Sequence, residues 1–405
     1  MGEPMKKIMQ INITCGNGST GKLALALYNE SVAAGFAGAF AYAEFEPKID
    51  TAFRIETKPQ NVLRRLQNRL LGRKQKHSAP GTKQLIRYIE REKPDLIHLH
   101  NIHHSILQYP VFFKYLKEKG IPFVFTLHDC WGFTGWCYHF VSRNCEEYKT
   151  GCGNCTRGGA RDDVGTPPHA AWQCKKDLLG GNDNAYPVCV SHWLRDCAMA
   201  SYMGQMKHPP ITIYNGIDTQ LFSPQKESAR AAFGIPEDAF VILSVASFWT
   251  EGKGLSMLLE LSEKLPPKTV LVLGGEGLAQ IKKPNVICFN RTESQEQLAS
   301  LYSTADVFIN ASIEETFGLT TAEAMACGTP AIVFNFTACP EIVDAHTGIV
   351  AEHTADGLLG AVLQIREKGK EAYRDACVKR VKEHFDETRM VNEYLALYRR
   401  ILNEQ

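Results

Sequence analysis

The sequence lacks any apolar run close to the roughly 20 residues that a membrane-spanning helix requires. Near the N-terminus, the basic pair Lys6-Lys7 is followed by only a short mixed run, so we expect no signal peptide and a cytoplasmic protein. Charge of one sign is not in excess either, because 45 Lys and Arg against 44 Asp and Glu give a net charge of +1. No overall field therefore attracts nucleic acid, and we expect none as a partner.

Low-complexity tracts and repeats of solenoid length are also absent, which excludes disordered and solenoid classes. What is present is 405 residues with 44% apolar and 10% aromatic side chains, enough for two or three domains of roughly 150 residues. Short apolar, β-branched runs alternate with helical patterns, which predicts an α/β fold with parallel sheets. The expected strands are Ile8–Ile13, Leu96–Leu99, Phe123–Leu127, Val188–Val190, Ile211–Ile213, Phe240–Val245, Val270–Leu273, Val286–Phe289, Val307–Ile309 and Ala331–Phe334.

The alternating pattern begins twice, which indicates two domains. A strand and a Gly-rich turn open the chain at Ile8–Gly21, and a second pair follows at Val241–Gly254. Turn-forming residues gather between them, so we place the boundary near 210 and predict domains 1–209 and 210–387. An apolar stripe from Met390 to Leu402 predicts that a terminal helix, 388–405, packs against another part of the protein.

The first chemical motif is the glycine turn Gly16–Lys22. It fits G-x4-G-K, the start of a phosphate-binding loop, but Leu23 stands where Mg²⁺ binding needs a Ser or Thr hydroxyl. A P-loop-type nucleotide-binding enzyme therefore stays an alternative. We favour a turn that faces substrate through backbone N–H groups and a helix N-terminus, with Gly18, Gly21 and Lys22 as substrate-binding residues.

The second motif contains two carboxylates, Glu315 and Glu323, eight residues apart. Thr320 or Thr321 is expected to cap a helix that carries Glu323 in its first turn, while Glu315 stays in the preceding loop. This spacing lets the two carboxylates hold different parts of one ligand.

The segment around these carboxylates, E-x-F-G-L-x-x-x-E-A-M-A-x-G-x-P, resembles the signature of glycosyltransferase family 4, a retaining family with the GT-B fold. Segments 213–224 and 301–309, and the N-terminal segments 94–100 and 126–129, resemble other landmarks of the same family. The Cys-rich part, 130–155, and the glycine turn resemble the subgroup of bacterial capsule, colanic-acid and exopolysaccharide pathways.

The resemblance implies two Rossmann-like domains facing across a cleft, with the terminal helix crossing back to the N-terminal domain. It implies a UDP- or GDP-sugar donor, a glycan or lipid-linked acceptor, and no cofactor required for catalysis. Glu323 would bind the nucleotide ribose, and His128 would lie near the reacting sugar as a catalytic residue. Glu315, also assigned to catalysis, would hold the donor sugar and phosphates together with the backbone of Phe317, Gly318 and Leu319.

The phosphate-binding loop departs from the family pattern. Lys253 matches the family's lysine, and we assign it to catalysis, but Ser247 stands where an arginine is expected. The loop is also expected to be one residue longer than usual. Lys253, glycine turns and helix N-termini would then stabilise the leaving group, with Ser247 as a substrate-binding position and Arg291 as a weak candidate substitute.

Cysteines are numerous, and eight of the thirteen lie between Cys130 and Cys197. One cluster, with a single C-x2-C, could bind structural Zn²⁺ through four thiolates; its members are Cys137, Cys145, Cys152 and Cys155. Buried thiols without metal are the alternative. A non-enzymatic, zinc-stabilised binding module is the corresponding alternative function.

The last motif is basic. No acidic residue occurs from Thr57 to Ile89, and the segment 58–76 alternates Lys and Arg with apolar residues. Such a pattern predicts a basic amphipathic helix that binds the inner membrane surface. The alternative is a solvated helix packed on its own domain.

Overall fold

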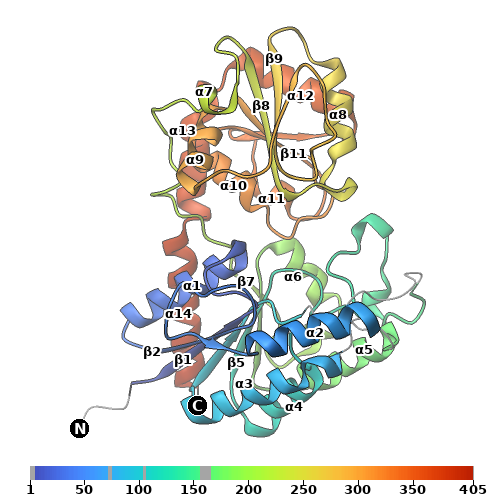
Figure 1. Cartoon of the computed structure of the whole chain (residues 1–405), viewed down its shortest axis with the longest axis vertical. Helices are drawn as coiled ribbons and strands as arrows, with labels where there is room; N and C mark the ends of the chain where they lie inside the picture. Colours follow the sequence, from blue (N-terminus) through green and yellow to red (C-terminus); the bar gives the residue numbers. More distant parts are fainter. Residues whose placement is uncertain (1–4, 72–74, 104–105, 156–165, 405) are drawn as a thin grey trace. The chain divides into compact units, whose positions relative to one another are not determined.

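The computed structural model describes residues 5–71, 75–103, 106–155 and 166–404. The chain divides into two compact units (Figure 1). Unit 1 comprises Met1–Ile213 with Val391–Gln405, and unit 2 comprises Tyr214–Met390. These boundaries lie a few residues after the ones predicted at 209/210 and 387/388.

Unit 1 contains a seven-stranded sheet in the order β3-β2-β1-β4-β5-β6-β7, and every neighbouring pair is parallel. The strands β1, β4, β5 and β6 are buried at nearly every position, as parallel strands covered on both faces must be. The bounds are β1 Lys7–Asn12, β2 Ala37–Tyr42, β3 Phe53–Arg54, β4 Leu96–Leu99, β5 Phe123–Leu127, β6 Ala185–Cys189 and β7 Ile211–Thr212.

The helices of unit 1 connect these strands. They are α1 Gly18–Ala33, α2 Lys58–Leu71, α3 Ala79–Glu92, α4 Tyr109–Lys119, α5 Pro168–Lys175 and α6 His192–Met199. The helix α14, Glu387–Asn403, contributes its last turns to the same unit. Its buried side chains there include Val391, Tyr394, Leu395, Leu397, Tyr398 and Ile401. Among the described residues, no helix combines the length and apolar character needed to cross a bilayer.

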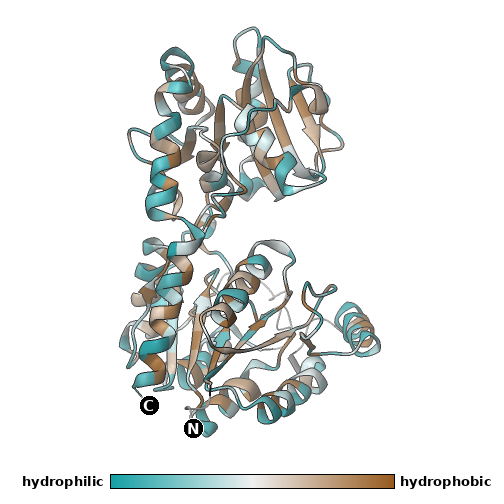
Figure 2. Cartoon of the chain, turned by 90° about the vertical axis from the view of Figure 1, so that its left-hand side faces the viewer, coloured by the Kyte–Doolittle hydropathy of each residue, from teal (hydrophilic) through white to brown (hydrophobic). Residues whose placement is uncertain are grey.

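Unit 2 contains a six-stranded sheet in the order β10-β9-β8-β11-β12-β13, again parallel throughout. Its strands are β8 Phe240–Phe248, β9 Thr269–Glu276, β10 Val286–Phe289, β11 Val307–Asn310, β12 Ala331–Phe334 and β13 Gly348–Ala351. Its helices are α7 Arg230–Phe233, α8 Leu255–Lys264, α9 Gln295–Thr304, α10 Leu319–Ala326, α11 Cys339–Ile342, α12 Ala355–Lys368 and α13 Glu371–His384. In both units the strands form the apolar centre (Figure 2).

The two sheets share one topology, and the predicted α/β fold with two parallel, Rossmann-like sheets is confirmed. In each sheet the direction of strand addition reverses at one point, between β1 and β4 in unit 1 and between β8 and β11 in unit 2. Ligands of such sheets bind at the carboxyl ends of the strands beside this reversal. The loops that follow these four strands are therefore where each unit is expected to carry functional side chains.

Candidate functional site

The glycine turn of unit 1 follows β1, as predicted. Gly16 and Gly18 have positive φ angles of +79° and +68°, a conformation that favours glycine. Gly21 lies in the first turn of α1, and a Cβ there would lie 2.2 Å from Thr14 Oγ1. These glycines are therefore required by backbone shape and close packing, while Lys22 is exposed beside them.

Two histidines meet where the neighbouring strands β4 and β5 end. His100 follows β4, His128 follows β5, and His100 Nδ1 lies 3.1 Å from His128 Nε2. The other nitrogen of His100, Nε2, lies 3.0 Å from Gln10 Oε1 on β1. The sequence analysis assigned a role only to His128. His98 and His100 could have been found from the pattern His98-Leu99-His100, which places two histidines at the end of a predicted strand.

Burial keeps these imidazoles neutral. It lowers the pKa of His98 and His100 well below the ordinary value, and it lowers the pKa of His128 to about 4 despite the opposing effect of Asp129. Burial raises the pKa of the Asp129 carboxyl, but His103, whose Nε2 lies 2.7 Å away, helps to lower it to about 2. The strand ends thus present a neutral His128 next to an ionised aspartate.

In unit 2, Lys253 and Glu315 form an ion pair, with Lys253 Nζ 2.5 Å from Glu315 Oε1. Lys253 closes a short 3-10 turn after β8, and Glu315 lies in the loop after β11. The two loops approach so closely that a Cβ on Gly254, which has φ of +77°, would lie 2.3 Å from the carbonyl oxygen of Ala311. The structure therefore brings two of the predicted site residues together at the β8–β11 reversal.

Glu323 lies on α10, one turn from the end of the Glu315 loop. The prediction that Thr320 or Thr321 caps this helix is wrong: α10 begins at Leu319 after Gly318, which has φ of +102°. Thr321 instead contacts the side chain of Asn310, because Asn310 Nδ2 donates to its hydroxyl at 3.1 Å. Glu323 Oε2 accepts a hydrogen bond of 3.0 Å from Tyr302.

The side chain of Phe317 belongs to the core of unit 2. It is 2% exposed, and its ring centroid lies 5.9 Å from that of Tyr214 and 5.5 Å from that of Phe385. Its side chain is therefore not available to a ligand, and contacts through the backbone of Phe317, Gly318 and Leu319 stay a prediction.

Ser247 lies in an irregular part of β8, and a loop longer than that of the family stays a prediction. Between Val245 and Phe248, three steps along β8 correspond to two along β9, which is a β-bulge. Ser247 is exposed, and Trp249 is anchored by donation from its indole N–H to the Gly274 carbonyl at 2.9 Å. Arg291, the weak substitute for the missing arginine, is exposed and pairs with Glu276 at 2.6 Å.

The cysteine cluster does not form a ligand set as folded. Among the described residues, which include all four predicted zinc ligands, no group of three or more His, Cys, Asp or Glu is placed to hold a metal ion. Burial raises the pKa of Cys152 to about 11, which favours the thiol over the thiolate. Beside it, the buried Lys175 donates to the carbonyls of Trp131 (2.7 Å) and Gly135 (3.1 Å), and burial lowers its pKa to about 7.

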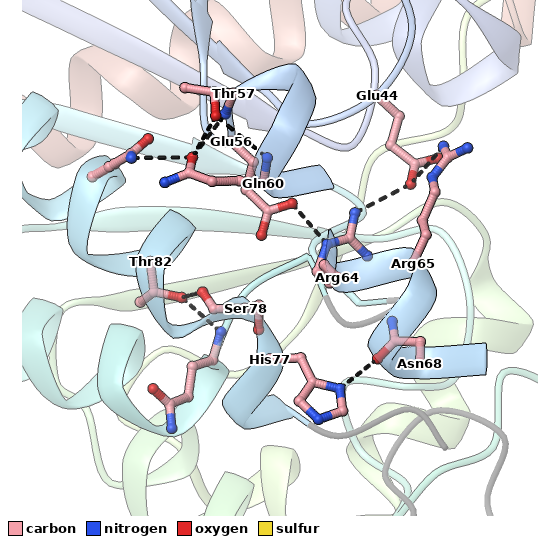
Figure 3. Close-up of polar contacts among 12 residues, drawn as sticks. Glu44, Glu56, Thr57, Gln60, Arg64, Arg65, Asn68, His77, Ser78 and Thr82 are labelled. Atoms are coloured by element: carbon pink, nitrogen blue, oxygen red, sulfur yellow. Dashed lines mark hydrogen bonds and ion pairs between the residues drawn. The ribbon is translucent and has the colours of Figure 1, made fainter. Parts of the chain in front are cut away.

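The helix α2 has its polar side inward (Figure 3). Arg64, 3% exposed, donates through Nε to Glu56 Oε2 at 2.7 Å, and its Nη2 lies 3.4 Å from Glu44 Oε1. The exposed side combines basic residues with apolar ones, of which Val62 is 66%, Leu63 55%, Leu66 50% and Leu70 71% exposed. The predicted membrane segment 58–76 includes residues 72–74, which lie outside the described residues.

Comparisons with known proteins agree with this architecture. Residues 225–384 match the family described as Glycosyl transferases group 1, and residues 30–156 match Glycosyltransferase Family 4. Sucrose-phosphate synthase from Thermosynechococcus elongatus superposes with a TM-score of 0.75 at 19% identity, covering 99% of this chain and 100% of that one. Anabaena Alr3699/HepE in complex with UDP and glucose gives a TM-score of 0.69 at 14% identity, covering 97% of this chain and 99% of that one.

Among curated proteins, the chain is 30% identical over 171 residues to D-inositol 3-phosphate glycosyltransferase of Mycolicibacterium smegmatis, which covers 39% of this chain. The match spans 37% of that relative's length, and 47% of the length of the corresponding protein of Mycolicibacterium paratuberculosis.

The two parallel-sheet units therefore have the GT-B fold of these solved structures, and residues 225–384 and 30–156 resemble the domains of Glycosyl transferases group 1 and of Glycosyltransferase Family 4. The curated relatives compared above bear the name D-inositol 3-phosphate glycosyltransferase, which does not refer to a capsule or exopolysaccharide. The substrates, the stereochemical course and the subgroup are consequently matters of proposal.

Proposed function

We propose that this protein is a retaining glycosyltransferase that moves a sugar from a UDP- or GDP-sugar to a glycan or lipid-linked acceptor in cell-surface polysaccharide synthesis. The observation that carries the proposal is the Lys253–Glu315 pair at the β8–β11 reversal, with Glu323 on the adjoining helix. A cation and two separate carboxylates at this edge suit the diphosphate, sugar and ribose of one nucleotide sugar.

Lys253 supplies the positive charge that a departing nucleoside diphosphate requires. In the structure this charge is balanced by Glu315, so donor binding would exchange a carboxylate contact for a diphosphate contact and release Glu315 to accept from a sugar hydroxyl. Glu323, which already accepts from Tyr302, would accept from a ribose hydroxyl. The exposed Ser247 adds a hydroxyl but no charge.

The proposed transfer is a front-face substitution. The bond between the anomeric carbon and the diphosphate oxygen breaks, and the acceptor oxygen bonds to the same face of that carbon. The acceptor proton passes to the departing phosphate oxygen, so the step needs no metal or covalent intermediate. The resemblance assigns His128 to the transferred sugar.

The donor proposal is tested by thermal shift with UDP-, GDP-, ADP- and dTDP-sugars, with ATP and Mg²⁺ as a separate arm. A ligand at about 100 times its dissociation constant adds roughly 2.7 kcal/mol of apparent stability. We expect one sugar nucleotide to stabilise the wild type without metal and to lose this effect in Glu323→Ala. Glu367→Ala, which removes an exposed carboxylate on α12, is the matched control.

Stabilisation by ATP and Mg²⁺ alone, unchanged in Glu323→Ala, would contradict the proposal and favour the alternative at Gly16–Lys22. Acceptors are then tested with the identified donor. The panel includes D-inositol 3-phosphate, because the curated relatives are named for that acceptor.

We also propose that the protein works at the inner membrane face through α2. A soluble helix normally buries its apolar side, whereas α2 buries Arg64 and exposes Leu63, Leu66 and Leu70. Exposed Lys58, Arg65 and Arg69 on the same helix would add attraction to anionic lipid.

The membrane proposal is tested by sedimentation with phosphatidylglycerol vesicles. The double variant Leu66→Glu, Leu70→Glu should abolish pelleting of the protein. The control Leu363→Glu, on α12, should not. Absence of pelleting by the wild type would refute the proposal.

The structural zinc remains a proposal for direct metal analysis. Protein prepared without chelators should contain close to one equivalent of zinc if the four thiols rearrange into a site, and the Cys145→Ser, Cys155→Ser double variant should contain none. Metal-free wild-type protein that is fully folded would eliminate the site.

A further inference from the structure

A continuous chain of buried hydrogen bonds connects α14 to His128 within unit 1. The hydroxyl oxygen of Tyr398 lies 2.5 Å from His98 Nδ1. The same oxygen accepts a hydrogen bond of 3.3 Å from Gln10 Nε2. Gln10 Oε1 in turn lies 3.0 Å from His100 Nε2, and His100 Nδ1 lies 3.1 Å from His128 Nε2. Gln10, His98, His100 and Tyr398 are all less than 2% exposed, so water does not compete for these groups.

The amide of Gln10 sets the direction of the whole chain. Its Nε2 donates to the hydroxyl oxygen of Tyr398, and its Oε1 is directed at His100 Nε2. The Tyr398 hydroxyl therefore accepts from Gln10 and has its own proton for His98 Nδ1.

The remaining steps follow from the single proton of a neutral imidazole. His100 must carry its proton on Nε2 in order to donate to Gln10 Oε1, so its Nδ1 is an acceptor. His128 must then donate from Nε2 to His100 Nδ1, which leaves the lone pair of His128 on Nδ1. Since Nε2 is committed to His100, His128 can interact with a sugar hydroxyl only as an acceptor at Nδ1.

The groups around this chain are consistent with neutral imidazoles. Beyond His98 Nε2 lie the hydroxyls of Thr126 on β5, at 2.7 Å, and of Tyr394 on α14, which is 2.7 Å from Thr126. Among the groups near His128, Asp129 raises its pKa and His103 lowers it; burial has the largest effect and outweighs Asp129.

We infer that Gln10 and Tyr398 are positioning residues that hold His128 as a neutral imidazole with its proton on Nε2, acting through His100. The inference depends on the proposed function only for the role of His128 at the transferred sugar. Neither residue belongs to the motifs that carry the family resemblance, and Tyr398 lies 270 positions from His128 in the sequence.

The experiment is long-range ¹H–¹⁵N NMR of imidazole-labelled full-length protein at pH 7, with His128 assigned by its loss in His128→Gln. We expect a protonated Nε2 and an unprotonated Nδ1 in the wild type. In Gln10→Leu and in Tyr398→Phe, the ratio of the Nε2–H to the Nδ1–H form should fall at least threefold. Tyr394→Phe is the matched control. It removes a buried hydroxyl from the same helix, but this hydroxyl contacts Thr126 and not Gln10, so the ratio should not change.

A wild-type His128 protonated on Nδ1, or charged, would overturn the inference even if every variant failed to fold. An unchanged ratio in both folded variants would also overturn it. Thermal shift with UDP- and GDP-glucose is recorded on the same samples. If neither stabilises the wild type while the tautomer is as expected, the proposed function is weakened and the positioning role stands.

Discussion

Acidification from pH 6.5 to 5.5 should destabilise unit 1 strongly, because it contains three buried neutral histidines. The pKa of an unfolded histidine is about 6.5, whereas burial lowers the pKa of His98, His100 and His128 in the folded protein. The unfolded chain therefore binds more protons below pH 6.5. The stability that the neutral imidazoles contribute is present above that value and is lost as the pH falls toward the folded values, about 4 for His128.

The size of the effect follows from proton linkage. Each proton bound only by the unfolded state changes stability by about 1.36 kcal/mol per pH unit. An unfolded histidine is on average about three-quarters protonated between pH 6.5 and 5.5, so each of the three costs about 1 kcal/mol. The total, about 3 kcal/mol, is a large part of a typical stability of about 5–15 kcal/mol.

Urea unfolding at the two pH values, followed by tryptophan fluorescence, measures this loss. Four of the five tryptophans lie in unit 1, so the signal reports chiefly on that unit. His128→Asn should reduce the loss by about one-third, since one of three contributing groups is removed. His346→Asn, which removes an exposed histidine of unit 2, controls for the loss of an imidazole in general. A loss below about 1 kcal/mol in the wild type would refute the linkage argument.

Two further predictions concern buried charge and backbone strain. Arg64→Ala leaves the buried Glu56 carboxylate without its cation and should lower the free energy of unfolding in urea by about 3–5 kcal/mol. Arg65→Ala, at an exposed pair, should lower it by at most about 1 kcal/mol. Equal losses in the two variants would contradict the role of the buried pair. Gly254→Ala places a Cβ 2.3 Å from a backbone oxygen at a residue with positive φ. It should lower the free energy of unfolding by about 1–3 kcal/mol more than Gly234→Ala, where φ is also positive but the space is open. Similar melting temperatures for the two variants would show that the loops of Gly254 and Ala311 can separate freely.

The fold was predictable where strands are β-branched or aromatic. The bounds of β4, β5, β10 and β12 agree with the expected ranges. The strand β2 was missed because its sequence, AGAFAY, contains small residues with low strand propensity. It forms because it pairs with β1 along its whole length, a long-range contact that local patterns do not contain.

The candidate site was only partly predictable for a similar reason. Carboxylate spacing and the family resemblance singled out Glu315, and the resemblance alone singled out Lys253; the structure brings the two within 2.5 Å. Local propensity failed at Thr321, because Asn310 on a neighbouring strand offers its hydroxyl a tertiary partner. The inverted polarity of α2 was also hidden, since the partners of Arg64 lie 8 and 20 positions away in the sequence.

The position of Tyr398 has a genetic consequence. A nonsense mutation at the codon of Tyr398 leaves every residue of the Glu315–Glu323 block in place. It nevertheless removes the hydroxyl that orients Gln10, and with it the constraint on the proton of His128. Such an allele should produce a protein that keeps the Lys253–Glu315 pair but no longer fixes the proton of His128, so a lesion 270 positions away would resemble a mutation of His128 itself.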